Sequence, residues 1–419
     1  LHRDPRDRGH APSVSGDVPA LVDHLFRRNA ARITATLTRV LGADRLDLAE
    51  DVVQEAMAKA LAQWPFGGIP NDPAAWLFRV ARNQAIDRLR RDANFRTKER
   101  AIVDAFSARE GTTGRFSHEL EDDDLQMMLM CCDPRLPPES RLALTLKCVC
   151  AFGVDEIARA LLAKPEAIAQ RLVRAKRFLR DNAIELELPS REELPRRLDS
   201  LLDVVYLMFN EGYAATAGDD LVRRDLVDEA IRLAEELAGH EETSLPKTHA
   251  LAALLHLQRA RLATRVDAAG DLLLLEEQDR SRWDEEAIAH GLRHFGLAAA
   301  GDELTRFHVE AAIAVEHLTE PANWPRILGL YDELIEIAPS PVVALNRAVA
   351  VAMVDGPERG LAVAMTLAPE LRDYIPLYST IGELARRAGN SALAREYFLD
   401  GAERARTLPL KRWFEKRGR

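Results

Sequence analysis

The chain has 419 residues, of which 47% are hydrophobic and 30% are charged, and its formal net charge is −10 at pH 7. This length predicts two or three domains. No apolar run approaches the ~18 residues of a membrane-spanning helix, so we expect neither a membrane span nor a membrane partner. The acidic excess lies entirely in residues 187–419, whereas residues 1–186 are nearly balanced. The first part can therefore be locally basic and contact nucleic acid, and the second is unsuited to it.

The first 18 residues are charged, contain Gly and Pro, and lack the apolar core of a signal peptide. We expect a disordered lead-in, consistent with a natural start further upstream, and a cytoplasmic protein. Apolar periodicity then predicts a helix over residues 20–42, ended by Gly42. This helix opens a first helical domain, residues 19–100.

The second predicted helix covers residues 46–64. Its apolar stripe contains Val52, Ala56 and Leu61. The opposite face carries an acidic and amide patch formed by Asp51, Gln54 and Glu55. This patch suits a basic partner helix, and the alternative is an ordinary solvated face.

A loop rich in Gly and Pro is predicted next, because Pro65 ends the second helix. Asp72 is a good N-cap and Pro73 is the favoured first residue of a third helix, which runs to about residue 93. The basic side chains of the third helix are Arg79, Arg82, Arg88, Arg90 and Arg91. On charge alone, such a helix is more often a solvated face than a DNA reader.

Residues 101–120 lack a strong period and are expected to form a linker before a second domain, residues 121–186. The centre of this domain has helix-turn-helix form, with a short helix over residues 155–161 and a longer one over residues 166–180. The basic outer face of the longer helix is formed by Arg171, Arg174, Lys176, Arg177 and Arg180. Such a pair either reads DNA or is an ordinary helical hairpin.

The cysteines all lie in this second domain, at Cys131, Cys132, Cys148 and Cys150. Their spacing is not that of a zinc site, and no histidine lies between them. Each has apolar neighbours on a predicted helix. We therefore predict buried thiols that act as small hydrophobes, with redox sensing or metal binding as the alternatives.

Residues 187–419 read as Ala- and Leu-rich helices with acidic surfaces. The last unit, residues 378–405, has the spacing of a tetratricopeptide repeat at Gly382, Ala385, Gly389, Ala394 and Phe398. Earlier repeats are degenerate, so we expect a repeat-like helical domain rather than a regular solenoid. The predicted fold class is all-α, in three parts.

Two polar clusters stand out in this C-terminal domain, and their members are Asn210, Glu211, Tyr213, Gln278, Asp279, Arg280 and Trp283. They form either a regulatory surface for a signal protein or ligand, or a satisfied polar network between helices. As a regulatory surface they are expected to pack against the N-terminal half. The histidines of this domain show no metal-ligand spacing: His249, His256, His290, His294, His308 and His317. Since no nucleophile–base set, P-loop or dinucleotide motif occurs either, we expect no metal, no cofactor and no enzymatic activity.

Several ordered motifs resemble bacterial RNA polymerase sigma factors of the extracytoplasmic-function type, group 4 of the sigma-70 family. Three segments resemble region 2 of these factors: AEDVVQEA, WPFGG…DPAAWL and VARNQAIDRLRR. Two further segments resemble region 4: LPPESRLALTLKCVC and EIARALLAKPEAIAQRLVRAKR. YLMFNEGY, LEEQDRSRWD and SPVVALNRAVAVA resemble a subgroup with a fused tetratricopeptide-like domain. Asp133 stands where this subgroup has a histidine after the paired cysteines, which lowers any metal interpretation further.

The resemblance implies a factor that binds core RNA polymerase and directs promoter recognition, DNA melting and transcription initiation. Its partners in the polymerase would be the β′ clamp helices and the β flap. The β′ clamp helices would contact Asp51, Gln54 and Glu55. At the −10 element, Phe66 would stack on a flipped base and Asn83 would hydrogen-bond to it. The five arginines of the third helix would hold phosphates.

At the −35 element the resemblance implies contacts from Glu166, Ala167, Gln170, Arg171, Arg174, Lys176 and Arg177. Gln170 suits adenine and Arg171 suits guanine, while the other basic residues suit phosphates. The fused domain implies regulation in cis. The alternatives are a polymerase-independent helix-turn-helix regulator with a tetratricopeptide-like interaction domain, and a repeat scaffold whose basic helices are incidental.

Overall fold

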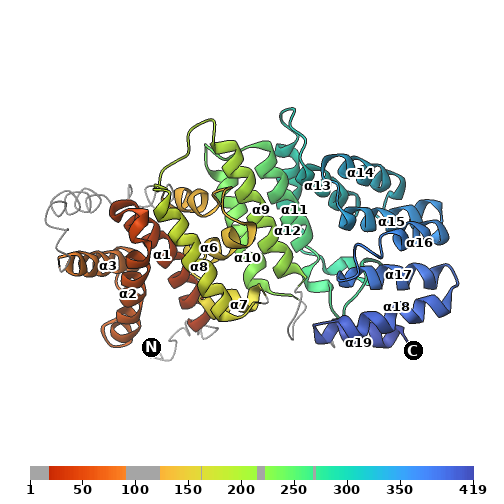
Figure 1. Ribbon diagram of the computed structural model, residues 1–419, viewed down its shortest axis with the longest axis horizontal. Helices are drawn as coiled ribbons and strands as arrows, with labels where there is room; N and C mark the ends of the chain where they lie inside the picture. The colour runs from red at the N-terminus through yellow and green to blue at the C-terminus, as the bar shows by residue number, and fades with distance from the viewer. Residues whose placement is uncertain (1–17, 91–122, 162, 215–221, 268–269) are drawn as a thin grey trace, which may run out of the picture. The chain divides into compact units, whose positions relative to one another are not determined.

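The computed structural model describes residues 18–90, 123–161, 163–214, 222–267 and 270–419, which are helical nearly throughout (Figure 1). The all-α prediction is confirmed, since these ranges contain no β-strand and only isolated bridge residues, such as the pair Val266 and Leu272. Every helix described is too short or too polar to span a bilayer. The predicted lead-in before residue 18 and the linker over residues 101–120 lie outside the described residues.

The chain divides into two compact units. The first contains the chain up to residue 131 together with residues 143–153 and 171–188, and the second contains residues 132–142, 154–170 and 189–419. The predicted second domain is therefore shared between the units, and its boundaries stay a prediction.

Three helices build the larger part of the first unit: α1 (Val18–Leu41), α2 (Leu46–Gly67) and α3 (Pro73–Leu89). They share one apolar core, in which Leu37 of α1, Val52 and Val53 of α2, and Leu77 and Phe78 of α3 are nearly inaccessible to solvent. The end of α1 at Gly42 is confirmed by the positive φ of 95° there.

The end of α2 differs from the prediction, because the helix continues through Pro65 to Gly67. Proline removes only its own N–H bond, and the helix ends where Gly68 turns to φ +81° and donates its N–H to the carbonyl of Trp64, at 3.0 Å. Leu61 was predicted on the buried stripe but is 61% exposed, and Ala60 occupies the core instead.

The predicted start of α3 is confirmed. The side chain of Asp72 accepts a hydrogen bond from the backbone N–H of Ala75 at 2.9 Å, and Pro73 is the first helical residue. The rings of Trp64 and Trp76 pack edge to face with centroids 5.5 Å apart. The loop between α2 and α3 is therefore anchored at both ends.

Residues 123–131 form a further helix of the first unit, and ion pairs link it to α1. Arg39 is 3.0 Å from the buried Asp123, and Arg32 is 3.2 Å from Asp124. The helices that follow are α6 (Pro138–Cys148), α7 (Val154–Ala160) and α8 (Pro165–Asp181). All four cysteines are buried and unoxidised, as predicted for thiols that act as small hydrophobes.

The C-terminal domain makes up most of the second unit. Its α-helices are, in chain order, α9 (Leu194–Tyr213), α10 (Arg224–Gly239), α11 (Pro246–Arg259), α12 (Glu285–Ala298), α13 (Arg306–Glu316), α14 (Trp324–Ile337), α15 (Pro341–Asp355), α16 (Pro357–Thr366), α17 (Ile375–Arg387), α18 (Ser391–Arg404) and α19 (Leu408–Arg417). Between α11 and α12 the chain forms short 3₁₀ turns, including η4 (Leu275–Glu277) and η5 (Arg280–Arg282). Consecutive helices pack as pairs, the arrangement expected of helical repeats.

Small residues set the spacing of these helix pairs. A Cβ added at Gly382 of α17 would lie 2.5 Å from the ring of Phe398 on α18, closer than real Cβ contacts occur. A Cβ at Gly401 would lie 2.4 Å from the ring of Phe414 in the same way. The tetratricopeptide spacing seen in the sequence therefore has its expected packing, with a glycine beneath an aromatic ring.

Gly382→Ala should lower the free energy of unfolding by about 1–3 kcal/mol, because the new methyl group overpacks against Phe398. Gly329→Ala is the matched control, since that glycine lies in the interior of α14 with open space beside it. The control should be neutral or gain about 0.5–1 kcal/mol from helix propensity. Thermal unfolding followed by circular dichroism measures both, and equal melting temperatures for the two variants would contradict the packing described.

Candidate functional site

The acidic patch of α2 is on the surface, as predicted. Asp51, Gln54 and Glu55 are exposed, while their neighbours Val52 and Val53 are buried in the core. Because the opposite face of α2 is buried in the core, the rotation of the helix is fixed and the carboxylates cannot turn inward. They face solvent, where a basic side chain can reach them.

One of the predicted phosphate-binding arginines lies against this patch instead. Arg88 of α3 contacts Asp51 at 3.3 Å and also pairs with Glu55, and Gln84 donates to Glu55 at 3.0 Å. Arg88 follows Arg79 by nine residues, which is about two and a half helical turns and therefore the opposite face of α3. This spacing was readable in the sequence and separates Arg88 from Arg79 and Arg90.

The other face of α3 carries the residues predicted to meet the −10 element. Arg79, Asn83 and Arg90 are exposed and fall within a narrow arc of the helix. The Arg82 guanidinium donates to the amide oxygen of Asn83 at 3.0 Å. Arg90 lies 3.8 Å from Asp87. Arg91 lies outside the described residues.

Phe66 is almost fully exposed in the last turn of α2, at 93% of its accessible surface. Leu61 and Ile69 beside it are 61% and 64% exposed. Phe66 therefore does not belong to the hydrophobic core of the first unit. An exposed ring at the start of the loop is free to stack on a base.

Helices α7 and α8 cover the two helices predicted for the helix-turn-helix, and α8 has one buried and one polar side. Ile168, Leu172, Ala175 and Leu179 are buried at helical spacing. The predicted −35 contacts that are exposed are Glu166, Ala167, Gln170, Arg174 and Arg177, and Arg171 is half-buried. Gln170 and Arg171 lie in the first half of the helix, where recognition helices contact base edges.

Lys176 is mostly buried and paired with acids, unlike the exposed members of this set. Its ammonium lies 2.6 Å from Asp47 and 2.9 Å from Glu50 of α2, and its side chain is only 15% exposed. Burial by itself would lower the pKa of Lys176, but the charge of Glu50 and the hydrogen bonds of both acids raise it. Two carboxylates thus pair with Lys176 inside the first unit, and its ammonium links α8 to α2.

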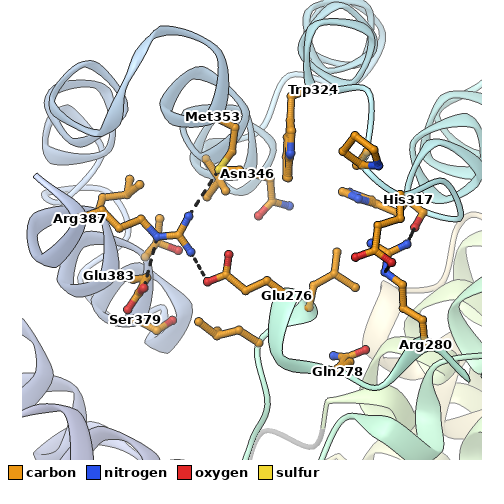
Figure 2. A pocket seen from close by; sticks show the side chains of 18 of the residues that line it. Glu276, Gln278, Arg280, His317, Trp324, Asn346, Met353, Ser379, Glu383 and Arg387 are labelled. Atoms are coloured by element: carbon orange, nitrogen blue, oxygen red, sulfur yellow. Dashed lines mark hydrogen bonds and ion pairs between the residues drawn. The ribbon is translucent and has the colours of Figure 1, made fainter. Parts of the chain in front are cut away.

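The C-terminal domain holds a pocket of about 760 Å³ between the η4–η5 segment and helices α14, α15 and α17 (Figure 2). Arg387 reaches across it to Glu276 and to the sulfur of Met353 at 3.4 Å. Arg280 donates to the carbonyls of His317 and Thr319 at 2.8 and 3.2 Å.

The walls of this pocket combine charges of both signs with an aromatic ring and an amide. Burial and the charges of nearby arginines lower the pKa of His317 to about 4, so its ring is neutral at neutral pH. Trp324 packs against His317, and Asn346 also lines the space. Such a lining suits a polar ligand with an apolar part.

The predicted regulatory residues do not form one surface. Gln278, Asp279 and Arg280 line the pocket, whereas Asn210, Glu211, Tyr213 and Trp283 do not. The guanidinium of Arg265 stacks 3.8 Å above the ring of Tyr213 and donates to its carbonyl. Trp283 is buried beneath Arg261 and Arg280. These contacts are made within the C-terminal domain, as the alternative of a polar network between helices predicts.

Comparison with known proteins adds to this geometry. Residues 25–95 match Sigma-70 region 2, residues 126–179 match Sigma-70, region 4, and residues 197–299 match a family of unknown function (DUF6596). The chain belongs to the sigma-70 family. It is a sigma factor of the extracytoplasmic-function kind with a fused C-terminal helical domain, and its role is in promoter recognition.

A protein of Rhizobium meliloti (strain 1021), described as uncharacterised, is 38% identical to this sigma factor over 364 residues. The similarity covers 84% of this chain and 85% of that protein, and thus extends through the C-terminal domain. No solved structure matches.

One buried acid joins the region 4 segment of the sigma factor to its C-terminal domain, and the sequence did not reveal it. Asp133 is fully buried and lies 2.7 Å from Arg135 and 3.1 Å from Arg197, which is in α9. Burial would raise the pKa of Asp133, but the hydrogen bonds of Arg135 and the charge of Arg197 outweigh it and hold the pKa below its usual range. Arg141 of α6 likewise donates to the hydroxyl of Ser200 on α9.

Pocket residues far apart in sequence were also missed, among them His317, Trp324, Asn346, Glu383 and Arg387. Asn346 lay in a segment that the sequence had singled out, SPVVALNRAVAVA, and Glu383 and Arg387 lay in the repeat-like unit of residues 378–405, but neither segment indicated a pocket. The others come from helices whose periodicity shows burial but does not show which helices meet.

Proposed function

We propose that this sigma factor binds core RNA polymerase through α2, engages the −10 and −35 elements through α3 and α8, and helps to open the promoter. It would act in the cytoplasm, where the polymerase works. The observation that carries the proposal is the pair of opposed faces on α2 and α3, with Asp51 and Glu55 on one and Arg79 and Asn83 on the other. Acids repel DNA, so the first face needs a protein partner.

The competing function is that of a helix-turn-helix regulator that acts without polymerase. Such a protein would use the exposed residues of α8 in the same way, but it would have no use for the acidic face of α2 or for the exposed Phe66. The two functions therefore differ in whether core polymerase binds, which the first experiment measures.

Reversing both carboxylates of α2, in Asp51→Lys/Glu55→Lys, should abolish binding of core RNA polymerase. Their pairs with Arg88 are exposed and contribute only about 0–1 kcal/mol each, so the fold should persist. Glu333→Lys/Glu336→Lys is the control, because it reverses two exposed acids one turn apart on α14. Pull-down of core enzyme checks the prediction, and normal retention of the α2 variant would favour the polymerase-independent regulator.

The −35 readout divides into base and phosphate contacts. Arg171→Ala should cost about 1–3 kcal/mol at one base pair and relax the preference there, because a bidentate contact to guanine is lost. Arg174→Ala, on the exposed side of the same helix, should weaken binding equally on all sequences and reduce the salt slope by about 1. Fluorescence anisotropy of the holoenzyme on promoter variants at several salt concentrations separates the two. Identical profiles for both variants would contradict this division.

We further propose that the C-terminal domain controls the sigma factor in cis by bracing region 4. Arg197 and Ser200 of α9 hold Asp133 and Arg141, which belong to the segment matched to region 4. Without Arg197, one of the two arginine partners of a buried carboxylate is lost, which is costly in a nonpolar environment. The contact therefore favours a domain that is required for activity over one that only inhibits.

Arg197→Ala should lower promoter-dependent transcription and the melting temperature together. Arg196→Ala is the control, because Arg196 is the exposed neighbour of Arg197 in the same helix and should change neither. Run-off transcription with core polymerase gives the activity. Raised transcription by the Arg197 variant would show that the domain inhibits instead.

A further inference from the structure

Four histidines and one glutamate of the C-terminal domain meet where α10, α11 and α12 pack together. The three helices are neighbours in the second unit and lie side by side in green in Figure 1. The residues are Glu235 of α10, His249 and His256 of α11, and His290 and His294 of α12. All five fall within residues 197–299, the segment that matches the family of unknown function.

Helical spacing and a glycine bring these side chains together. His290 and His294 are one turn apart on α12, and His249 and His256 are two turns apart on α11. Between the two histidines of α12, Gly291 faces α11, where an added Cβ would lie 2.7 Å from the Leu257 side chain. Because no side chain separates the helices at this point, the imidazoles of α12 reach those of α11.

The contacts within the cluster are short. A single carboxylate oxygen of Glu235 accepts from His256 Nε2 at 2.5 Å and from His294 Nε2 at 3.1 Å. The Nδ1 atoms of His249 and His294 are 2.9 Å apart. One ligand atom each from Glu235, His256 and His290 lie within 4.8 Å of one another.

The hydrogen bonds among the described residues leave one buried nitrogen of this cluster without a partner. His256 is only 7% exposed, and its Nδ1 has no hydrogen-bond partner among the described residues. A buried ring nitrogen without a partner is costly, and a metal ion bound at that nitrogen would supply one.

We propose that Glu235, His256 and His290 bind a divalent transition-metal ion, with Zn²⁺ as the representative of this class. Two imidazole nitrogens and one carboxylate oxygen are a ligand set that Zn²⁺ accepts, with a fourth position left open. Bonds of about 2.0–2.2 Å require ligand atoms about 3.4 Å apart, so the side chains would close by small rotations. His294 positions the Glu235 carboxylate. The ion would fasten three helices of the domain to one another.

The test uses full-length protein that has been treated with chelator and dialysed, then titrated with Co²⁺ and with Zn²⁺. We expect uptake of one equivalent, visible d–d absorption of a four-coordinate Co²⁺, and a melting temperature that Zn²⁺ raises by about 5 °C or more. His256→Gln and His290→Gln should each weaken binding by about 100-fold or more. His240→Gln, which changes a histidine outside the cluster, should bind as the parent does.

The half-exposed His290 allows the second variant to fold even if loss of the buried His256 does not. Absence of saturable uptake would overturn the proposal. Undiminished binding by the folded His290→Gln variant would overturn it too. Intense near-ultraviolet charge-transfer bands of Co²⁺ would assign the ion to the buried cysteines instead, and would likewise refute a site at the histidines.

Discussion

The packing of α2 against α3 is the constraint on which the predicted interfaces of the sigma factor depend. Val52 and Val53 can be buried against Leu77 and Phe78 in only one rotation of each helix. That rotation places the carboxylates of α2 on one surface and Arg79, with Asn83, on another. The two opposed faces are therefore a consequence of core packing, and no further interaction is needed to keep these side chains on separate surfaces.

Within the first unit, several charges that the sequence leaves ambiguous are matched inside the protein. Lys176 is held by two acids of α2, Arg88 by the acidic patch, and Arg39 by Asp123. An ammonium or guanidinium that is already paired gains less from a phosphate, because it must first give up its partner. Pairing thus reduces a broad basic surface to a smaller set of side chains suited to DNA.

In the C-terminal domain, close helix approach at small residues decides where polar side chains meet. Gly382 admits the ring of Phe398, and Gly291 admits the side chain of Leu257. The first contact belongs to the core next to the pocket, and the second brings the histidines of α12 to those of α11. A domain built from such pairs gathers residues from distant repeats without any motif that is continuous in sequence.

The sequence by itself determined the all-α class, the N-cap at Asp72, the burial of the cysteines and the repeat-like packing of the last helices. These follow from local rules, namely helical periodicity, capping chemistry and the size of side chains. It also placed Asp51, Gln54 and Glu55 on the outer face of α2. It did not show that α2 runs through Pro65, since the glycine that ends the helix outweighs the proline as a stop signal.

Only the tertiary structure decided which distant side chains meet. Asp133 and Arg197, Lys176 and Glu50, and the histidines of α11 and α12 are separated by dozens of residues, and no periodicity relates them. Their partners depend on which helices pack together and at what rotation, and the total burial and shape of each helix face settle that choice. A sequence pattern with a period of one helical turn contains no information about it.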